Sequence, residues 1–381
     1  MFTTYTDERA ALVEAVHDFA AAALAPNAAR WDAEKHFPVD TLREAGEIGL
    51  GGIYVGEDVG GSGLSRLDAV AIFEELAKGD VTIAAYISIH NMVAWMIDAH
   101  GTTEQRRQWL PRLVTMQDLG SYCLTEPGAG SDAAALTTSA VRDGDDYVLN
   151  GTKQFISGAG TSAVYVVMAR TGEPGAKGIS AIVVPGDAPG LGFGPNEKKM
   201  GWNAQPTRQV IFDDVRVPVS NLLGAEGDGF GIAMKGLNGG RVNIAACSLG
   251  GAQWAFDKAL RYVQEREAFG GPLSANQSVV FTLADMETDL QASRALLERA
   301  AEKMDQGAPD VAIACAMAKR FATDAAFGVA NTALQLHGGY GYLQEYGLER
   351  VVRDLRVHQI LEGANEIMKL VVGRGLLATS R

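Results

Sequence analysis

The sequence predicts an α+β fold in which an N-terminal helical domain and a C-terminal helical bundle flank a middle β domain. Apolar residues recur every three or four positions in the first and last thirds of the chain, as on the buried faces of helices. The middle third instead carries short β-type runs between turn residues. No long helical pattern separates these runs, which favours an antiparallel barrel or sandwich over a doubly wound parallel sheet. We place the three domains at residues 1–120, 121–226 and 227–381.

Capping patterns mark helix starts in the first domain. Ser65 stands three residues before Asp68, and Thr102 stands three residues before Gln105, which is the spacing of a capping box. A further, strongly apolar helix is expected over residues 86–97. Near the N-terminus, one face of a predicted helix carries Leu12, Val13, Val16, Phe19, Ala20 and Leu24.

The middle and C-terminal domains differ in their periodicity. Asp143-Gly144-Asp145 predicts a hairpin turn. From Gly229 the pattern is helical again, and apolar residues from Leu283 to Met304 alternate steps of three and four, which is typical of a helical bundle. The expected strands cover residues 147–149, 163–168, 179–184 and 209–212.

Charge and motif content exclude several classes of protein. A net charge of −13 argues against general nucleic-acid binding. The three cysteines are widely spaced and the six histidines lack ligand spacing, so we expect neither a disulfide framework nor a metal site. Residues 158–163 fit the loose dinucleotide pattern G-x-G-x-x-A, but a strand-like run follows where that motif needs a helix. No secretion signal or membrane-spanning run is visible, and we expect a cytoplasmic protein without membrane insertion.

Glu362 is the candidate for acid–base chemistry. It follows the apolar pair Ile360-Leu361 and precedes Gly363. A carboxyl group among apolar neighbours can have a raised pKa, as a general base for a weakly acidic proton requires. The same pattern fits a glutamate at a helix boundary with its carboxylate in water. Residue spacing alone leaves both interpretations open.

The loop 124–132 is the candidate for cofactor binding. Thr125 and Ser131 supply hydroxyl groups, Pro127 fixes a turn, and the glycines allow close approach of the backbone to a ligand. Such a loop could hold a flat, polar cofactor, although a simple turn has the same composition.

Three stretches together resemble the acyl-CoA dehydrogenase family of flavoenzymes. They are residues 124–132, 155–157 and 335–366, and the resemblance extends over nearly the whole chain. It is strongest toward members that act on isobutyryl-CoA, because of longer shared stretches at 61–68, 85–92, 201–208, 236–241 and 356–363. The resemblance implies that FAD lies between the β domain and the C-terminal helices. It also implies a homotetramer built as a pair of dimers.

The same resemblance assigns roles to individual residues. Glu362 matches the catalytic base, and Gly240 stands where some relatives carry that base instead. Thr125 and Ser157 would lie near flavin N5, with Phe155 beside the ring. The flavin end of FAD would be held by Tyr122, Cys123, Leu124, Thr125, Gly130, Ser131, Phe155, Ile156 and Ser157. The adenosine diphosphate end, across a subunit boundary, would be held by Arg266, Phe269, Asn276, Gln277, Gln335, Leu336, His337, Gly338 and Gly339, and a further contact is expected from Ala364, Asn365 and Glu366.

For the acyl-CoA substrate, the matching positions are Ser131, Asn238, Gly239, Gly240, Arg241 and Arg374. Arg241 and Arg374 could also be structural salt-bridge partners, an interpretation that applies above all to Arg374, near the C-terminus. Leu361 replaces the tyrosine that precedes the base in straight-chain relatives, which is compatible with a pocket for a short, branched chain.

The implied reaction is the FAD-dependent conversion of isobutyryl-CoA to methacrylyl-CoA in valine breakdown, with electrons passed to electron-transfer flavoprotein. Dehydrogenation of 2-methylbutyryl-, isovaleryl- or butyryl-CoA is an alternative, as is an acyl-CoA oxidase. A protein of another class, which binds a flavin or an acyl-CoA without turnover, would not need Glu362.

Overall fold

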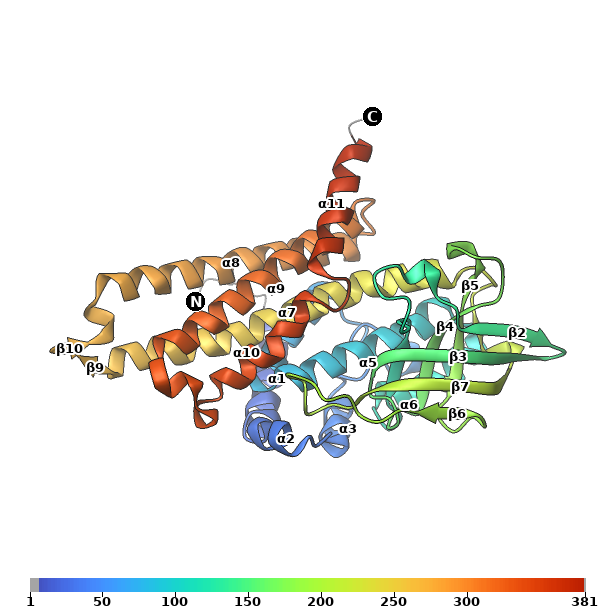
Figure 1. Ribbon diagram of the computed structural model, residues 1–381, viewed down its shortest axis with the longest axis horizontal. Helices are drawn as coiled ribbons and strands as arrows, with labels where there is room; N and C mark the ends of the chain where they lie inside the picture. Colours follow the sequence, from blue (N-terminus) through green and yellow to red (C-terminus); the bar gives the residue numbers. More distant parts are fainter. Residues whose placement is uncertain (1–6, 380–381) are drawn as a thin grey trace.

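The computed structural model describes residues 7–379, in which two helical regions flank a β domain, as predicted (Figure 1). Capping boxes are confirmed at Ser65 and Thr102, where Asp68 and Gln105 complete the reciprocal bonds. In the described chain, α5 alone is long and apolar enough to cross a membrane, but 83% of its most apolar window is buried in the protein, as in a core helix. The N-terminal helices are α1 (Asp7–Phe19), α2 (Ala28–Glu34), α3 (Val39–Glu47), α4 (Arg66–Gly79), α5 (Val81–His100) and α6 (Thr103–Val114).

The β domain is one sheet of order β6-β7-β3-β2-β4-β5-β8, with β1 paired to β4. It is antiparallel except where β1, and the first residue of β2, run parallel to β4. The predicted hairpin turn joins β2 to β3. Two expected strands are longer than predicted, because register shifts in β3 interrupt the alternation that sequence patterns rely on. The strands are β1 (Gly120–Cys123), β2 (Ser139–Asp143), β3 (Asp146–Ser157), β4 (Val164–Arg170), β5 (Ile179–Pro185), β6 (Leu191–Phe193), β7 (Thr207–Pro218) and β8 (Leu222–Leu223).

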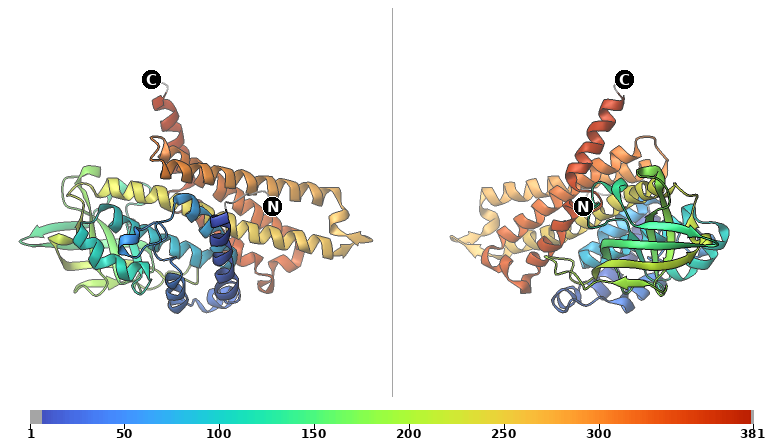
Figure 2. Two further views of the ribbon diagram at one scale, coloured as in Figure 1. Left: turned by 180° about the vertical axis from the view of Figure 1, so that it is seen from behind. Right: turned by 45° about the vertical axis from the view of Figure 1, so that its right-hand side comes forward.

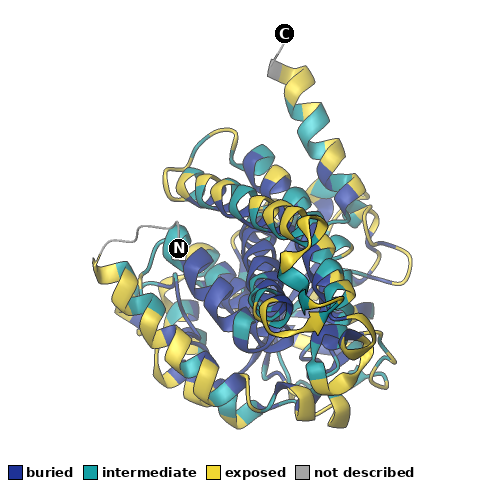
Figure 3. Cartoon of the chain, turned by 90° about the vertical axis from the view of Figure 1, so that its left-hand side faces the viewer, coloured by how far each residue is buried: buried dark blue, intermediate teal, exposed yellow. Residues whose placement is uncertain are grey.

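The C-terminal helices form an elongated bundle around α7, whose central part is buried. Seen from the end of the bundle, buried segments gather in the middle and exposed faces surround them (Figure 3). The last helix, α11, projects away from the rest of the molecule (Figures 1 and 2). The helices are α7 (Gly229–Glu265), α8 (Gln277–Asp305), α9 (Val311–Leu336), α10 (Leu348–Arg356) and α11 (Asn365–Thr379), and a hairpin of β9 (Glu267–Ala268) and β10 (Gly271–Pro272) lies between α7 and α8.

The loop between β6 and β7 fixes the β domain to the C-terminal helices. The main-chain N–H of Trp202 donates to Asp354 on α10 at 2.6 Å. The indole N–H of Trp202 donates to Nε2 of His358 at 3.2 Å, and Nδ1 of His358 lies 2.6 Å from the Ser248 hydroxyl on α7. Burial lowers the pKa of His358 to about 3, so the ring stays neutral and keeps both contacts. These bonds hold the segment that leads into Glu362.

Candidate active site

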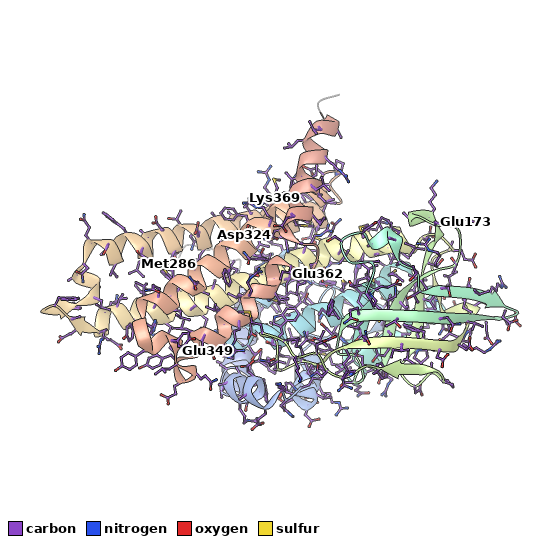
Figure 4. All side chains as sticks on the ribbon, in the orientation of Figure 1. Glu173, Met286, Asp324, Glu349, Glu362 and Lys369 are labelled. Carbon is purple, nitrogen blue, oxygen red and sulfur yellow. The ribbon has the colours of Figure 1, made fainter. Side chains whose placement is uncertain are left out.

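Glu362 lies in a short loop between the 3₁₀ turn Val357–Gln359 and α11, where the C-terminal helices approach the β domain (Figure 4). Its φ angle is 55° and that of Gly363 is 90°, so two successive residues have left-handed backbone. Such a conformation is strained for a residue with a Cβ and occurs at functional sites. The loop directs the carboxylate onto α7 at Gly240, where an added Cβ would lie 2.5 Å from Oε2 of Glu362. Gly240 therefore makes room for the carboxylate.

The environment of the Glu362 carboxylate disfavours its charged form. Its Oε2 atom is buried and has no hydrogen-bond partner among the described residues. Burial raises the pKa of Glu362 to about 7, although the positive charges of Arg241 and Lys319 act in the opposite direction. A carboxyl group with a pKa near neutrality can accept a proton at physiological pH and release it again. This arrangement favours the general-base interpretation over a solvated helix-boundary glutamate.

Two cationic side chains hold the loop that carries Glu362. Arg241 donates from Nε to the carbonyl oxygen of Glu362 at 3.1 Å and from Nη1 to Asn238 at 2.9 Å. Lys319 donates from Nζ to the carbonyl oxygen of Gly363 at 2.8 Å. In residues 7–379, no carboxylate lies within salt-bridge distance of Arg241. Sequence reasoning missed Lys319, whose only signal is a lysine within the alanine-rich run of α9.

A buried ion pair brings the two candidate flavin-binding segments together. Lys153 on β3 is fully buried and donates to Glu126 at 2.8 Å and to the carbonyl oxygen of Leu124 at 3.0 Å. Burial would raise the pKa of Glu126, but the charge of Lys153 and hydrogen bonds from Thr137 and Thr138 outweigh it and lower that pKa to about 2. Neither member of this pair was singled out from the sequence. Their separation of 27 positions hides the contact from local patterns.

Between these segments the surface suits a flat aromatic group with polar edges. Phe155 has a φ angle of 60° and is 62% exposed. Neither the Thr125 nor the Ser157 hydroxyl bonds to another described residue, although their carbonyl groups accept bonds from Gln154 and Ser121. The Tyr122 hydroxyl is buried and has no partner among the described atoms. Gly130 and Ser131 are exposed, whereas the side chains of Cys123, Leu124 and Ile156 are buried, so the structure brings these last three near the site only through their backbone.

A second cluster forms at the far end of α9. Six residues expected at the adenosine diphosphate end line one pocket of about 500 Å³, with the Arg266 guanidinium 5.6 Å from the Tyr340 ring. Since Lys319 and Gln335 are 16 positions apart on α9, the cluster lies roughly 24 Å along the helix from Glu362. Phe269, Asn276 and Gln277 are exposed at this end, outside the pocket. The expected residues that line it are Arg266, Gln335, Leu336, His337, Gly338 and Gly339.

Residues 364–366 and Arg374 lie at the start and on the surface of α11. The Asn365 side chain is buried and donates to Thr323 at 3.0 Å and to Asp324 at 2.7 Å, so it fixes the loop to α9. Ala364 is half-buried and Glu366 is exposed. Arg374 is exposed on α11, nine positions after Asn365, and within the described chain no hydrogen bond or ion pair joins it to Glu362.

Comparison with known proteins identifies one family along the chain. Family models described as the N-terminal, middle and C-terminal domains of acyl-CoA dehydrogenase match residues 6–117, 121–215 and 227–377. The chain is 54% identical over 372 residues to mitochondrial isobutyryl-CoA dehydrogenase of Bos taurus, covering 98% of this chain and 89% of that protein. It is 57% identical over 360 residues to the protein of the same name in Dictyostelium discoideum, covering 94% and 86%. The exact domain boundaries placed from the sequence stay a prediction.

Solved structures share the fold over nearly the whole chain. Butyryl-CoA dehydrogenase from Megasphaera elsdenii matches with a TM-score of 0.96 and 39% identity, covering 99% of this chain and 100% of that one. A structure described as an electron transferring flavoprotein of Acidaminococcus fermentans matches with a TM-score of 0.96 and 40% identity, covering 99% and 100%. A structure described as PigA with FAD and proline matches with a TM-score of 0.95 and 29% identity, covering 99% of each chain.

Proposed function

The chain belongs to the acyl-CoA dehydrogenase family of oxidoreductases, and from that premise we propose that it dehydrogenates a short branched-chain acyl-CoA with the help of FAD. The proposed reaction converts isobutyryl-CoA to methacrylyl-CoA, as in valine breakdown. One observation carries the proposal: the half-buried Glu362 has a buried Oε2 atom without a partner among the described residues, and desolvation raises the pKa of its carboxyl group to about 7.

Glu362 is proposed to remove the α-proton of the thioester. Its raised pKa matches a base that works near neutral pH. Because the α-proton of a thioester is only weakly acidic, donors must stabilise the negative charge that develops on the carbonyl oxygen. The main-chain N–H of Glu362 bonds to no other described residue and could serve as one such donor. Arg241 holds the carbonyl group of the same residue, in the peptide unit that follows, and so helps to fix the loop.

The residues around Phe155 and Arg266 fit FAD. Bound there, FAD would accept the hydride that leaves Cβ. The exposed Phe155 ring, the unpaired Tyr122 hydroxyl and the free space beside Gly128 and Gly130 suit the flavin end. Arg266 offers a guanidinium to a diphosphate in an acidic protein, and residues 335–339 line the same pocket. The description of one structural relative as containing FAD supports the same cofactor.

A homotetramer is proposed, in which two subunits together would complete each cofactor site. The two clusters lie at different points along α9, so the Arg266 cluster is expected to serve the FAD of a neighbouring subunit. The projecting α11 also carries exposed Leu370, Leu376 and Leu377, which a second copy could cover. The electron acceptor is proposed to be an electron-transfer flavoprotein, a name that one structural match carries.

Substrate preference can be tested by comparing kcat/KM for four thioesters. We expect isobutyryl-CoA to give a higher kcat/KM than 2-methylbutyryl-, isovaleryl- and butyryl-CoA, because the two 54–57% identical relatives bear the isobutyryl name and Leu361 is compatible with a branched chain. A preference of roughly tenfold or more for another thioester would overturn this substrate, since pocket fit to one methylene decides factors of that size. Oxygen uptake without an added acceptor tests the oxidase alternative, and little is expected.

The catalytic assignment is tested with Glu362→Gln. The amide fills the same space but cannot accept the α-proton at a useful rate, so the variant should stay yellow with bound FAD and lose nearly all turnover. A visible spectrum before and after anaerobic addition of isobutyryl-CoA gives both readings. A variant that still bleaches would place the base elsewhere. A wild-type protein that binds FAD or acyl-CoA without bleaching would favour the non-catalytic alternative.

A further inference from the structure

Lys319 is a buried cation for which packing gives no reason. Its side chain is fully buried on α9, between Cys315 and Thr323 on the same helix. In residues 7–379 no carboxylate lies within salt-bridge distance of its Nζ. A lysine is almost never fully buried without a charged partner, because removing the ammonium from water costs free energy that neutral acceptors only partly offset. The position therefore calls for an explanation beyond the stability of α9.

The contacts of Lys319 lead directly to Glu362. Nζ donates at 2.8 Å to the carbonyl oxygen of Gly363 and at 2.8 Å to Oδ1 of Asn365. Asn365 is itself fixed by Asp324 on α9. With Arg241 on the carbonyl oxygen of Glu362, cations from two different helices hold two successive carbonyl groups of one loop. These two hydrogen bonds stabilise a loop with left-handed backbone, which has no helical or strand hydrogen bonds of its own.

Around the carboxylate, positive charge outweighs negative charge. Arg241 on α7 and Lys319 on α9 face it, and the neutral phenol of Tyr122 faces it from β1. The negative charges of Asp324 on α9 and Glu366 on α11 also act on Lys319 and raise its pKa. Burial lowers the pKa of Lys319 to about 8, with the carboxylate of Glu362 opposing the shift, so the ammonium remains mostly protonated at neutral pH.

We propose that Lys319 is a positioning residue for Glu362, whose buried charge also keeps the base ionised and stabilises negative charge on the bound thioester. The inference rests on the proposed function and deepens it. In the proposed reaction the Cα–H bond breaks and an O–H bond forms on Glu362. The electron pair of the broken Cα–H bond becomes the Cα=Cβ double bond, and the hydride that leaves Cβ would be taken up by bound FAD. The carboxylate thus becomes neutral, and both cations then act on the negative charge that develops on the thioester carbonyl oxygen in the transition state.

The test is the pH profile of kcat/KM in Lys319→Met, Lys319→Gln and Lys199→Met. Methionine fills the space without charge or donor, whereas glutamine restores a donor toward Gly363. Lys199→Met is the matched control. Lys199 is half-buried and its pKa is likewise lowered to about 8 by burial, but it bonds to Gln205 and Thr207 away from Glu362.

Without the ammonium charge, the apparent pKa of the base should rise by about one unit in both Lys319 variants. In Lys319→Met, kcat should fall by about tenfold or more with KM little changed, since an interaction with the transition state is lost. Lys319→Gln should retain more kcat, and Lys199→Met should keep the wild-type pH profile. An unchanged profile in the Lys319 variants, or an equal shift in the Lys199 variant, would overturn the proposal.

A second readout does not depend on turnover. The pKa of Glu362 is higher in the folded protein than in the unfolded chain, so its ionisation lowers stability as pH rises from its ordinary value of 4.5 to about 7. Denaturant unfolding of Lys319→Gln, with and without Glu362→Gln, locates that window. In the Lys319→Gln protein, this pH window should lie about one pH unit higher than in the protein that retains Lys319. If the pH window does not move, the electrostatic role of Lys319 is refuted, whether or not the protein turns over acyl-CoA. A protein that turns over no acyl-CoA would refute the proposed function, which is a separate outcome.

Discussion

At the scale of single residues, the protonation of Glu362 governs the pH dependence expected of the enzyme. Burial raises its pKa to about 7, and only the ionised form can accept the α-proton. We therefore expect kcat/KM for isobutyryl-CoA to rise with pH up to about 7 and to level off above it. The profile is measured with free enzyme and limiting substrate, where it reports groups of the unbound protein. A profile already flat between about pH 5 and 8 would mean that Glu362 titrates as an exposed carboxylate does.

Substitution of Gly240 by alanine offers a sharper test, because the resulting changes in activity and in stability should have opposite signs. Alanine normally stabilises a helix relative to glycine by roughly 0.5–1 kcal/mol. At Gly240, however, the new Cβ would lie 2.5 Å from Oε2 of Glu362 and displace the carboxylate. Gly240→Ala should therefore fold, bind FAD and lose kcat by about tenfold or more, as a misplaced base does.

Gly231→Ala is the matched control on the same helix, since its Cβ would meet no described atom within 4 Å. It should keep full activity and unfold at an equal or higher temperature. Equal activity in the two alanine variants would show that the carboxylate does not rest on Gly240.

At the scale of secondary-structure elements, features that depend on neighbouring positions can be predicted from the sequence, whereas contacts between distant positions cannot. The capping boxes at Ser65 and Thr102 are visible because both partners lie within four positions. The full length of β3 cannot be predicted in this way, because its register shifts interrupt the two-residue alternation of side chains. Glu126 and Lys153 also remain hidden, since charged residues are expected at the surface and nothing local indicates that these two are buried together.

That ion pair predicts a specific defect. Glu126→Gln would leave Lys153 buried without a carboxylate, which should cost about 3–5 kcal/mol of stability at neutral pH and loosen the loop expected to hold the flavin. In the wild type, the lowered pKa of Glu126 means that its contribution is present above its ordinary pKa of 4.5 and is lost as pH falls toward about 2.

Denaturant unfolding and the absorbance of retained FAD measure both effects. The double variant Glu126→Gln/Lys153→Met serves as the control, because replacing a whole buried pair is often far less damaging than breaking it. If Glu126→Gln alone were as stable as the wild type, the pair would not hold the loop.

At the scale of the whole molecule, the domain order follows from periodicity, but the site does not follow from any single domain. Glu362 depends on α7 and α9 for its surroundings, and the loop before it is tied to the β domain through Trp202 and His358. The residue pattern singled out Glu362 and the loop 124–132, and the family resemblance assigned their roles and those of the remaining cofactor residues. Only the structure shows that the Arg266 cluster lies apart from them in one chain.

This separation makes complementation between two inactive variants possible. Glu362→Gln removes the base from its own site, and Arg266→Glu removes the diphosphate contact from the neighbouring site. In a mixed dimer, one site then combines an intact Glu362 with an intact Arg266, and the other site lacks both. Random assembly makes half of the dimers mixed, so co-expression should restore about one quarter of wild-type activity per subunit.

Each variant alone should be nearly inactive. Co-expression of Glu362→Gln with Gly240→Ala provides the matched control, because both changes affect the same cluster within one chain and should regain nothing beyond the residual activity of Gly240→Ala. Activity is measured with isobutyryl-CoA on purified mixed protein after the oligomeric state has been determined. If the Glu362→Gln and Arg266→Glu mixture stayed as inactive as its components, each chain would have to bind FAD by itself, and the shared site would be refuted.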